Sequence, residues 1–461
     1  MLTVEKIGGT SMSRFKDVLE NIILPESKKK DPYNRVFVVS AYGGVTDWLL
    51  EHKKTGEKGI YAKFASMENY QEALEDLIRK LKAINKELEP IGLDLREADR
   101  FIEKRIRDLN SYLDSMSHVI SSGYISRDNI LLAGREMLAS IGEVHSAYNS
   151  AMIINANGVK ADFVDLSGFY DAEMLTIDER IRKTFKGIDT KKSLAIVTGY
   201  TKGTEGIMRE YDRGYSEVTF SKIAVELKPD EAVIHKEFHL SSADPQIVGL
   251  DKSVPVGKTN FDVADQLADI GMEAIHPKAS KPIEMAGINI RLKNTFDPGH
   301  PGTLITKDYI GSESRIEIIT GSKKVAAVEI HDPAMVGTVG FDLHIMEIFQ
   351  KYGVSYILKT TNANSITHLI WESSATNDFI GELKKEYELV VVQEAAVVCV
   401  IGSNIAKPGV LENATRVLAE KGININCLSQ SLRQVNIQFV IDRKDYTDAI
   451  IALNQRLCVD V

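Results

Sequence analysis

The sequence has few cysteines, no long apolar run and no excess of positive charge. Its 461 residues include three cysteines without the spacing of a metal site, so we interpret them as buried small hydrophobes in a reducing cytoplasm. No apolar run approaches the ~20 residues of a membrane helix, and we expect no secretory signal and no membrane partner. A net charge of −9 at pH 7 argues against nucleic-acid binding. The cysteines are Cys399, Cys427 and Cys458.

A lysine, two glycines and two hydroxyl residues follow the first apolar stretch, as Lys6-Ile7-Gly8-Gly9-Thr10-Ser11. Glycines let a backbone approach a ligand and direct successive N–H groups at it, and lysine adds a mobile charge that suits a phosphoryl group. The same residues also suit an ordinary turn or helix cap, and the motif is not a Walker loop. The pattern alone leaves a phosphate site and a plain turn open.

The first two thirds of the chain alternate strand-like and helix-like stretches. Such runs predict an open, mostly parallel sheet with helices on both faces, in which ligands bind at the carboxyl ends of the strands. Residues 70–120 differ, because they are highly charged with apolar residues at helical spacing, which favours an inserted helical hairpin over a short coiled coil. The predicted buried strands are 36–41, 151–154, 193–199 and 231–234.

The last third contains an internal duplication with a period of about seventy residues. A strand at 325–330, a helix at 341–352 and a strand at 353–358 are followed by the same order at 396–402, 410–422 and 423–426. A βαββαβ unit that occurs twice predicts a pair of ferredoxin-like modules.

Several ordered motifs together resemble the aspartate kinases, which combine an amino-acid-kinase fold with two C-terminal ACT modules. The resemblance implies a catalytic domain at 1–310 with a helical insertion at about 56–125, then ACT modules at 311–394 and 395–461. The opening motif matches the family's Lys-Phe-Gly-Gly-Thr-Ser with Ile7 in place of phenylalanine. The other matches are Val38-Val39-Ser40-Ala41 with Thr46, Ala274-Ile275-His276-Pro277-Lys278, Lys293-Asn294-Thr295-Phe296-Asp297-Pro298, Gly302-Thr303-Leu304-Ile305, Gly422-Ile423-Asn424-Ile425 and Ser429-Gln430.

The activity that this resemblance implies is the ATP-dependent phosphorylation of the side-chain carboxylate of L-aspartate to 4-phospho-L-aspartate. That step begins the synthesis of aspartate-derived amino acids or of ectoine. A carboxylate with a pKa near ~4 is already ionised at pH 7, so the reaction needs no general base. Mg²⁺ would bind with the nucleotide and needs no metal-ligand set in the protein. The implied catalytic and nucleotide-binding residues are Lys6, Gly8, Gly9, Thr10, Ser11, Lys236, Glu237 and Lys258.

The resemblance also implies a subsite for aspartate. Glu136, in Gly134-Arg135-Glu136, aligns with the family's Gly-Glu glutamate and would pair with the α-ammonium group, although Arg135 stands where the family has glycine. Arg213, in Arg213-Gly214-Tyr215-Ser216-Glu217, would hold the α-carboxylate bidentately. In that motif Tyr215 replaces a family glycine and Glu217 an aspartate. Glu136 and Arg213 count as catalytic residues as well, and the hydrogen-bonding partners would be Ser40, Thr46 and Ser216.

The ACT modules imply an amino-acid effector and an assembly larger than a monomer, a homodimer or more. In lysine-sensitive relatives two acidic side chains bind the effector lysine, and this chain has Ile357 and Ala363 at the matching positions. We therefore expect insensitivity to lysine and, at most, a response to threonine or another small polar metabolite. The candidate effector residues are Asp342, Thr361, Asn362, Asn424, Asn426 and Gln430.

Two other functions stay open at this point. A different amino-acid kinase, acting on glutamate derivatives or carbamate, lacks the duplicated C-terminal module. A catalytically inactive homologue that binds amino acids as a regulator would not need Lys6, Glu136 and Arg213 together. Trapping aspartyl phosphate with hydroxylamine would separate these functions from an aspartate kinase.

Overall fold

The computed structural model describes residues 1–27, 32–52, 55–211, 214–272 and 274–459. The chain forms two compact units. The first contains Met1–His239 and His276–Gly302, and the second contains Leu240–Ile275 and Thr303–Val461. Segment 240–275 therefore groups with the C-terminal residues, whereas the domain boundaries inferred from the sequence stay predictions. Within the described ranges, no helix combines the length and apolar character needed to cross a bilayer.

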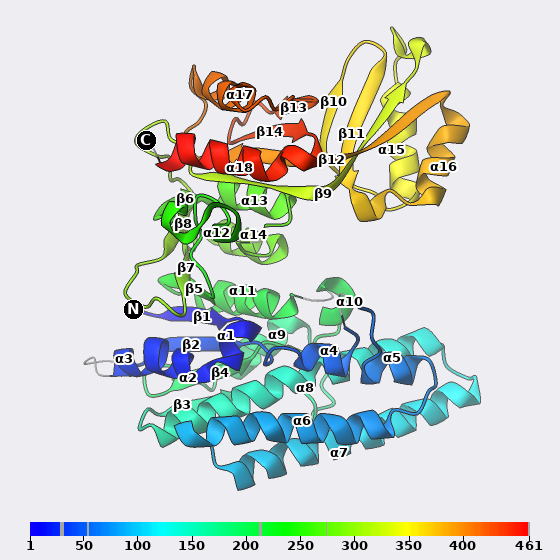
Figure 1. The fold of residues 1–461 in the computed structure, drawn as a ribbon. Coiled ribbons are helices and arrows are strands. Elements are labelled where there is room, and N and C mark those ends of the chain that lie inside the picture. Colours follow the sequence, from blue (N-terminus) through cyan, green and yellow to red (C-terminus); the bar gives the residue numbers. More distant parts are fainter. Residues whose placement is uncertain (28–31, 53–54, 212–213, 273, 460–461) are drawn as a thin grey trace. The chain divides into compact units, whose positions relative to one another are not determined.

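A parallel sheet forms the centre of the first unit (Figure 1). Its strand order is β3-β4-β2-β1-β5-β7, and every pairing along this order is parallel. Because the strands are parallel, their carboxyl ends meet at one edge, as the sequence predicts. The strands are β1 (Thr3–Ile7), β2 (Arg35–Val39), β3 (Ala161–Val164), β4 (Leu194–Thr198), β5 (Glu231–Lys236) and β7 (Ile290–Asn294).

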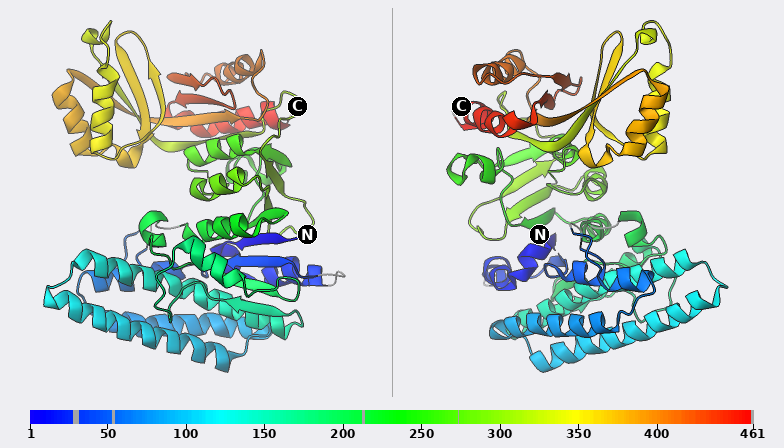
Figure 2. Two further views of the ribbon diagram at one scale, coloured as in Figure 1. Left: turned by 180° about the vertical axis from the view of Figure 1, so that it is seen from behind. Right: turned by 45° about the vertical axis from the view of Figure 1, so that its right-hand side comes forward.

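Helices cover both faces of this sheet. Helix α11 (Tyr215–Leu227) packs on β1 and β2, with α9 (Ile177–Phe185) and α14 (Pro277–Met285) beside it. Helix α8 (Arg127–Ala156) packs on β3 and β4, and the hairpin of α6 (Gln71–Leu88) and α7 (Leu95–Ser122) lies against it (Figures 1 and 2). The shorter helices are α1 (Gly9–Ser13), α2 (Phe15–Val18), α3 (Leu24–Ser27), α4 (Val45–Leu49), α5 (Ile60–Ala65) and α10 (Ile207–Tyr211).

One predicted strand is wrong, because residues 151–154 belong to the last turns of α8. This helix lies between the sheet and the hairpin and is buried on nearly every side along its C-terminal half. A helix that is buried all round loses its 3.6-residue apolar stripe and leaves a continuous apolar run, as a buried strand does. The strand of this region follows at β3.

The second unit is built on an antiparallel sheet with the strand order β10-β11-β9-β12-β14-β13. Strands β9 (Ile318–His331) and β12 (Leu389–Ile401) are long and take part in two separate hydrophobic cores. The other strands are β6 (Lys258–Asn260), β8 (Thr303–Thr306), β10 (Tyr356–Thr361), β11 (Ser365–Trp371), β13 (Cys427–Gln430) and β14 (Asn436–Ile441). The helices are α12 (Pro245–Val248), α13 (Phe261–Asp269), α15 (Phe341–Lys351), α16 (Asn377–Glu386), α17 (Val410–Glu420) and α18 (Tyr446–Asn454).

The internal duplication is visible in the way two helices end. After α15, Gly353 has φ +64° and the N–H of Val354 donates to the carbonyl of Phe349; after α17, Gly422 has φ +69° and Ile423 donates to Leu418. Both are glycine caps with a bond back to the last turn. These caps use the residues that were predicted to start strands, so β10 begins at Tyr356 and β13 at Cys427 rather than at 353 and 423.

Candidate active site

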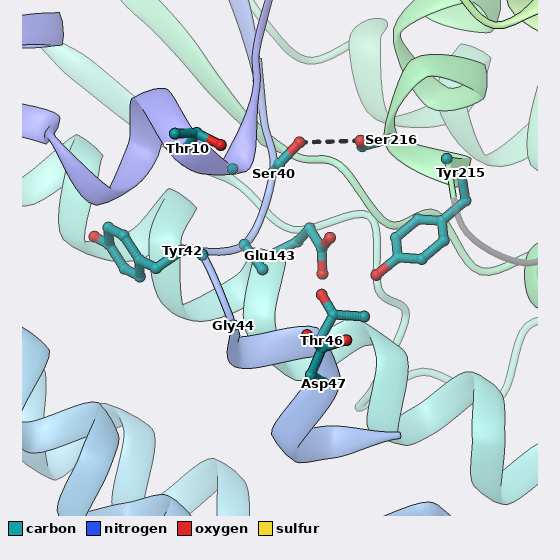
Figure 3. Close-up of a pocket in the computed structure, with 13 residues that line it drawn as sticks. Thr10, Ser40, Tyr42, Gly44, Thr46, Asp47, Glu143, Tyr215 and Ser216 are labelled. Carbon is teal, nitrogen blue, oxygen red and sulfur yellow. Dashed lines mark hydrogen bonds between the residues drawn. The ribbon is translucent and has the colours of Figure 1, made fainter. Parts of the chain in front are cut away.

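A pocket of about 310 Å³ lies at the carboxyl ends of β1 and β2 in the first unit. Residues that follow these strands line it together with the start of α11 and one side chain of α8 (Figure 3). Of the predicted residues, the structure brings Gly9, Thr10, Ser40, Thr46 and Ser216 together here. The remaining lining residues are Ala41, Tyr42, Gly43, Gly44, Asp47, Glu143, Gly214 and Tyr215.

The glycine turn after β1 is held close to the neighbouring strand end. A Cβ on Gly9 would lie 3.0 Å from the carbonyl oxygen of Ala41, which is backbone and cannot move aside easily. The Ser13 hydroxyl accepts a hydrogen bond of 2.7 Å from the Gly43 N–H and ties the two turns together. The Ser40 and Ser216 hydroxyls lie 3.0 Å apart across the pocket. Glycine at position 9 is therefore a requirement of close backbone packing.

Glu143 is the one carboxylate that α8 directs into this pocket, and the sequence interpretation did not identify it. The preceding residue, Gly142, allows the approach, because a Cβ there would lie 2.6 Å from the Ala41 Cβ. On the other side, a Cβ on Gly199 would lie 3.2 Å from the Glu143 Cγ. In Figure 3 the Glu143 carboxylate points toward the hydroxyls of Thr46 and Tyr215. Two glycines thus make room for one buried acid.

Glu143 is only 3% exposed, and among the described residues no group donates a hydrogen bond to its Oε2. Burial raises the pKa of Glu143 to about 7, while a hydrogen bond from Tyr215 and the charge of Lys6 act in the opposite direction. A buried carboxylate with a free oxygen is a costly feature unless a ligand completes it. A cationic group of a ligand would do so.

Lys6, at the end of β1, forms an ion pair with Glu217 of α11, with 3.3 Å between Nζ and Oε1. Burial opposes the charge of Glu217, but Lys6, Lys236 and the His276 N–H outweigh it and hold the pKa of Glu217 at about 2. Glu217 is therefore ionised at neutral pH and fixes the Lys6 ammonium beside the glycine turn. A Cβ on Gly8 would lie 3.7 Å from Lys6 Nζ.

Glu136 does not line the pocket. Its Oε1 accepts a hydrogen bond of 2.8 Å from the Met208 N–H, and its Oε2 accepts one of 2.7 Å from the Tyr200 hydroxyl. The neighbouring Arg135 forms a bidentate pair with Glu51. Burial raises the pKa of Glu136. Glu136 thus anchors the start of α10, whereas Glu143 lies one heptad further along the same helix.

The other predicted nucleotide and substrate residues are placed as follows. Lys236 is the last residue of β5 and Glu237 follows it. Glu237 Oε1 would lie 4.0 Å from a Cβ on Gly8, so Glu237 flanks the glycine turn. Ser11 donates to or accepts from the Thr295 hydroxyl at 3.0 Å. Lys258 belongs to the second unit, where its ammonium lies 4.9 Å from the centre of the Tyr309 ring. Arg213 lies outside the described residues.

The predicted effector residues fall into two groups. A hollow of about 340 Å³ in the second unit is lined by Thr361, Asn362 and Asn426 together with residues of β9, β11, β12 and β14. Asn424 donates to Asn426 at 2.8 Å, and Gln430 pairs with β14 at the end of β13. Asp342 is not among the lining residues and binds Lys359 instead, with 2.5 Å between Oδ2 and Nζ.

Comparisons with known proteins agree with this architecture. Residues 1–294 match the amino acid kinase family and residues 398–457 match the ACT domain. Aspartate kinase Ask_Ect of Stutzerimonas stutzeri (strain A1501) is 44% identical over 466 residues, which cover 99% of this chain and 97% of that protein. Chloroplastic aspartokinase 1 of Arabidopsis thaliana is 27% identical over 98% of this chain and 79% of that protein. The chain therefore belongs to the amino acid kinase family.

Solved structures show the same fold. Clostridium acetobutylicum aspartate kinase superposes with a TM-score of 0.74 at 22% identity, covering 99% of this chain and all of that one. Aspartokinase III of E. coli, solved in complex with aspartate and ADP, gives 0.73 at 18% identity, covering 99% of this chain and 100% of that one. The resemblance to aspartate kinases expected from the sequence motifs is confirmed over the whole chain.

Proposed function

We propose that this chain is an aspartate kinase, which transfers the γ-phosphoryl group of ATP to the side-chain carboxylate of L-aspartate. The observation that carries the proposal is the free oxygen of Glu143 in a pocket of hydroxyls beside Lys6 and a glycine turn. The 44% identity to an aspartate kinase over nearly the whole chain supports it. In the reaction an oxygen of the aspartate side chain bonds to the γ-phosphorus of ATP. The bond between the γ-phosphorus and the β–γ bridging oxygen breaks, and ADP leaves.

Each part of the site has a separate task in this proposal. Glu143 pairs with the α-ammonium group of aspartate, and that cation lowers the carboxylate's pKa from its raised value. Ser40, Thr46 and Ser216 donate hydrogen bonds to the substrate. Arg213 keeps its predicted role toward the α-carboxylate. The nucleophile is ionised at neutral pH, so catalysis consists of alignment and charge neutralisation.

The turn after β1 would bind the phosphates of ATP. The backbone of Gly8 to Thr10 and the Lys6 ammonium would hold the phosphates, and Lys6 would neutralise charge on the group in transfer. Mg²⁺, when bound, would supply further neutralisation. Among the described residues no three acidic, histidine or cysteine side chains gather as a metal site, so phosphate oxygens and water would be its main ligands.

Trapping of the product tests the reaction directly. With ATP and L-aspartate, hydroxylamine should convert the acyl phosphate to aspartyl hydroxamate, and one ADP should form for each hydroxamate. Succinate lacks the ammonium group that Glu143 would bind, so it should react far more slowly under the same conditions. Equal rates with succinate, or ADP formation without hydroxamate, would contradict the proposal.

We further propose that the second unit binds a small polar effector and joins two chains. The hollow offers neutral hydrogen-bonding groups from Thr361, Asn362 and Asn426 beside one carboxylate, Glu329. Outside the hollow, the acid Asp342 already has an internal cation in Lys359. Exposed apolar side chains on the sheet, including Leu389, Val391 and Leu428, would be covered by a second copy. Light scattering of the full chain should give a mass of at least two chains, and a fully active monomer would contradict this.

A further inference from the structure

Tyr215 places a phenol inside the active-site pocket. It is the first residue of α11, it is 3% exposed, and its ring lines the pocket opposite Thr46. Its hydroxyl points toward the Glu143 carboxylate (Figure 3) and also donates a long hydrogen bond of 3.4 Å to the Ala139 carbonyl oxygen. The side chain is therefore part of the wall that the substrate would meet.

Two tyrosines in this region serve two different carboxylates. The rings of Tyr200 and Tyr215 meet edge to face with 5.9 Å between their centres. The Tyr200 hydroxyl donates to Glu136, which lies outside the pocket, while the Tyr215 hydroxyl bonds to Glu143 within it. The two phenols are thus chemically alike and in contact, but each forms a hydrogen bond with a different carboxylate.

The groups that face Glu143 come from four elements. Lys6 of β1 and the Tyr215 hydroxyl of α11 stabilise its ionised form, as does the backbone N–H of Ala41 after β2. Asp47 of α4 lines the same pocket and is of like charge. Since the Oε2 atom has no donor among the described residues, the bonds made by Tyr215 and Ala41 leave that oxygen for a ligand.

We propose that Tyr215 is a positioning residue of the aspartate subsite, whose hydroxyl holds the Glu143 carboxylate with one oxygen turned toward the substrate ammonium. This inference rests on the proposed function. A hydrogen bond to the charged form of an acid favours that form, so the phenol keeps more of the enzyme ready to bind a cation at neutral pH. This role requires the Tyr215 hydroxyl, and a phenyl ring without the hydroxyl cannot perform it.

The test compares Tyr215→Phe with Tyr200→Phe as a matched control. For the wild type, kcat/KM for aspartate should rise with pH through the ionisation of Glu143. In Tyr215→Phe this rise should move upward by about one pH unit, so that KM for aspartate increases several-fold at pH 7 and recovers by about pH 8.5. KM for ATP should stay unchanged, and Tyr200→Phe should keep the wild-type pH profile.

A fluorinated tyrosine at position 215 gives the opposite sign and preserves the packing if the phenylalanine variant fails to fold. A more acidic phenol is a stronger donor, so the rise in kcat/KM should move to lower pH. An unshifted profile in the Tyr215 variants, or an equal shift in Tyr200→Phe, would overturn the inference. Absence of aspartyl hydroxamate from the wild type would instead reject the proposed function.

Discussion

Replacing Gly142 with alanine should weaken both stability and aspartate binding, although alanine is the better helix former. Gly142 lies inside α8, and its Cβ would be 2.6 Å from the Ala41 Cβ and 3.2 Å from the Val45 Cγ1. The first distance is well inside van der Waals contact. Overpacking of this kind costs about 1–3 kcal/mol, against a gain in helix propensity of about 1 kcal/mol. We expect net destabilisation of about 1 kcal/mol.

Gly381 is the matched control for this change. It also lies inside a helix, α16, but a Cβ there would have no heavy atom within 4 Å. Gly381→Ala therefore keeps the propensity gain without the clash and should stabilise its unit by up to about 1 kcal/mol. Calorimetry of each variant against the wild type, with the transitions of the two units followed separately, measures the opposite signs.

The functional consequence concerns the residue next to Gly142. Moving α8 away from Ala41 displaces Glu143, and a shift of about 1 Å at such a group can reduce kcat/KM by about 10². KM for aspartate should rise while KM for ATP stays within about twofold. If Gly142→Ala is as stable as Gly381→Ala and binds aspartate normally, the close approach of α8 to the strand end does not position the acid.

Three further predictions concern charge in the two units. Lys6→Ala should lower kcat by ~10²–10³ with the fold intact, because a preorganised charge at the transferring group is lost; retention of more than about a tenth of the wild-type kcat would contradict its role. Glu143→Gln should stabilise the ligand-free protein above pH 7. Burial raises the pKa of Glu143 from its ordinary value of 4.5 to about 7, so the folded state binds a proton there that the unfolded state has already lost. The free energy of unfolding of the wild type therefore falls as the pH rises from 4.5 to about 7. Urea midpoints at pH 5 and pH 8 should show a gap between variant and wild type that is larger at pH 8. Millimolar lysine should leave activity unchanged, since Lys359 already neutralises Asp342, and strong inhibition by lysine alone would show that the effector site lies elsewhere.

The sequence predicted the strand ends well, but its interpretation selected Glu136 and did not identify Glu143 on the same helix. The turn from Lys6 to Ser11 and the Ser40 hydroxyl lie at the ends of the buried strands β1 and β2, and parallel strands bring their ends together. Ser216 comes instead from the first turn of α11. Glu136 and Glu143 are seven residues apart and so share a helix face. The packing of α8 against the sheet places Glu143, and not Glu136, in the lining of the pocket.

A local signal for Glu143 was nevertheless present. Gly142-Glu143 reproduces the family's Gly-Glu pair without a substitution, whereas Glu136 is preceded by Arg135. A glycine inside a helix costs about 1 kcal/mol relative to alanine and therefore suggests a close contact. The misassigned strand at 151–154 has a related cause, since the same helix is too deeply buried to show an amphipathic pattern.

The most direct test of the account is the KM for aspartate in two single variants, Glu143→Gln and Glu136→Gln, measured with saturating ATP. Both changes remove one charge from α8 and keep the shape of the side chain. We predict that Glu143→Gln raises KM for aspartate by at least about tenfold, with little change in KM for ATP, because a desolvated ion pair to the substrate is lost. Glu136→Gln should have a much smaller effect on that ratio. A rise in KM for aspartate that is confined to Glu136→Gln would contradict the assignment of Glu143 as the partner of the substrate ammonium.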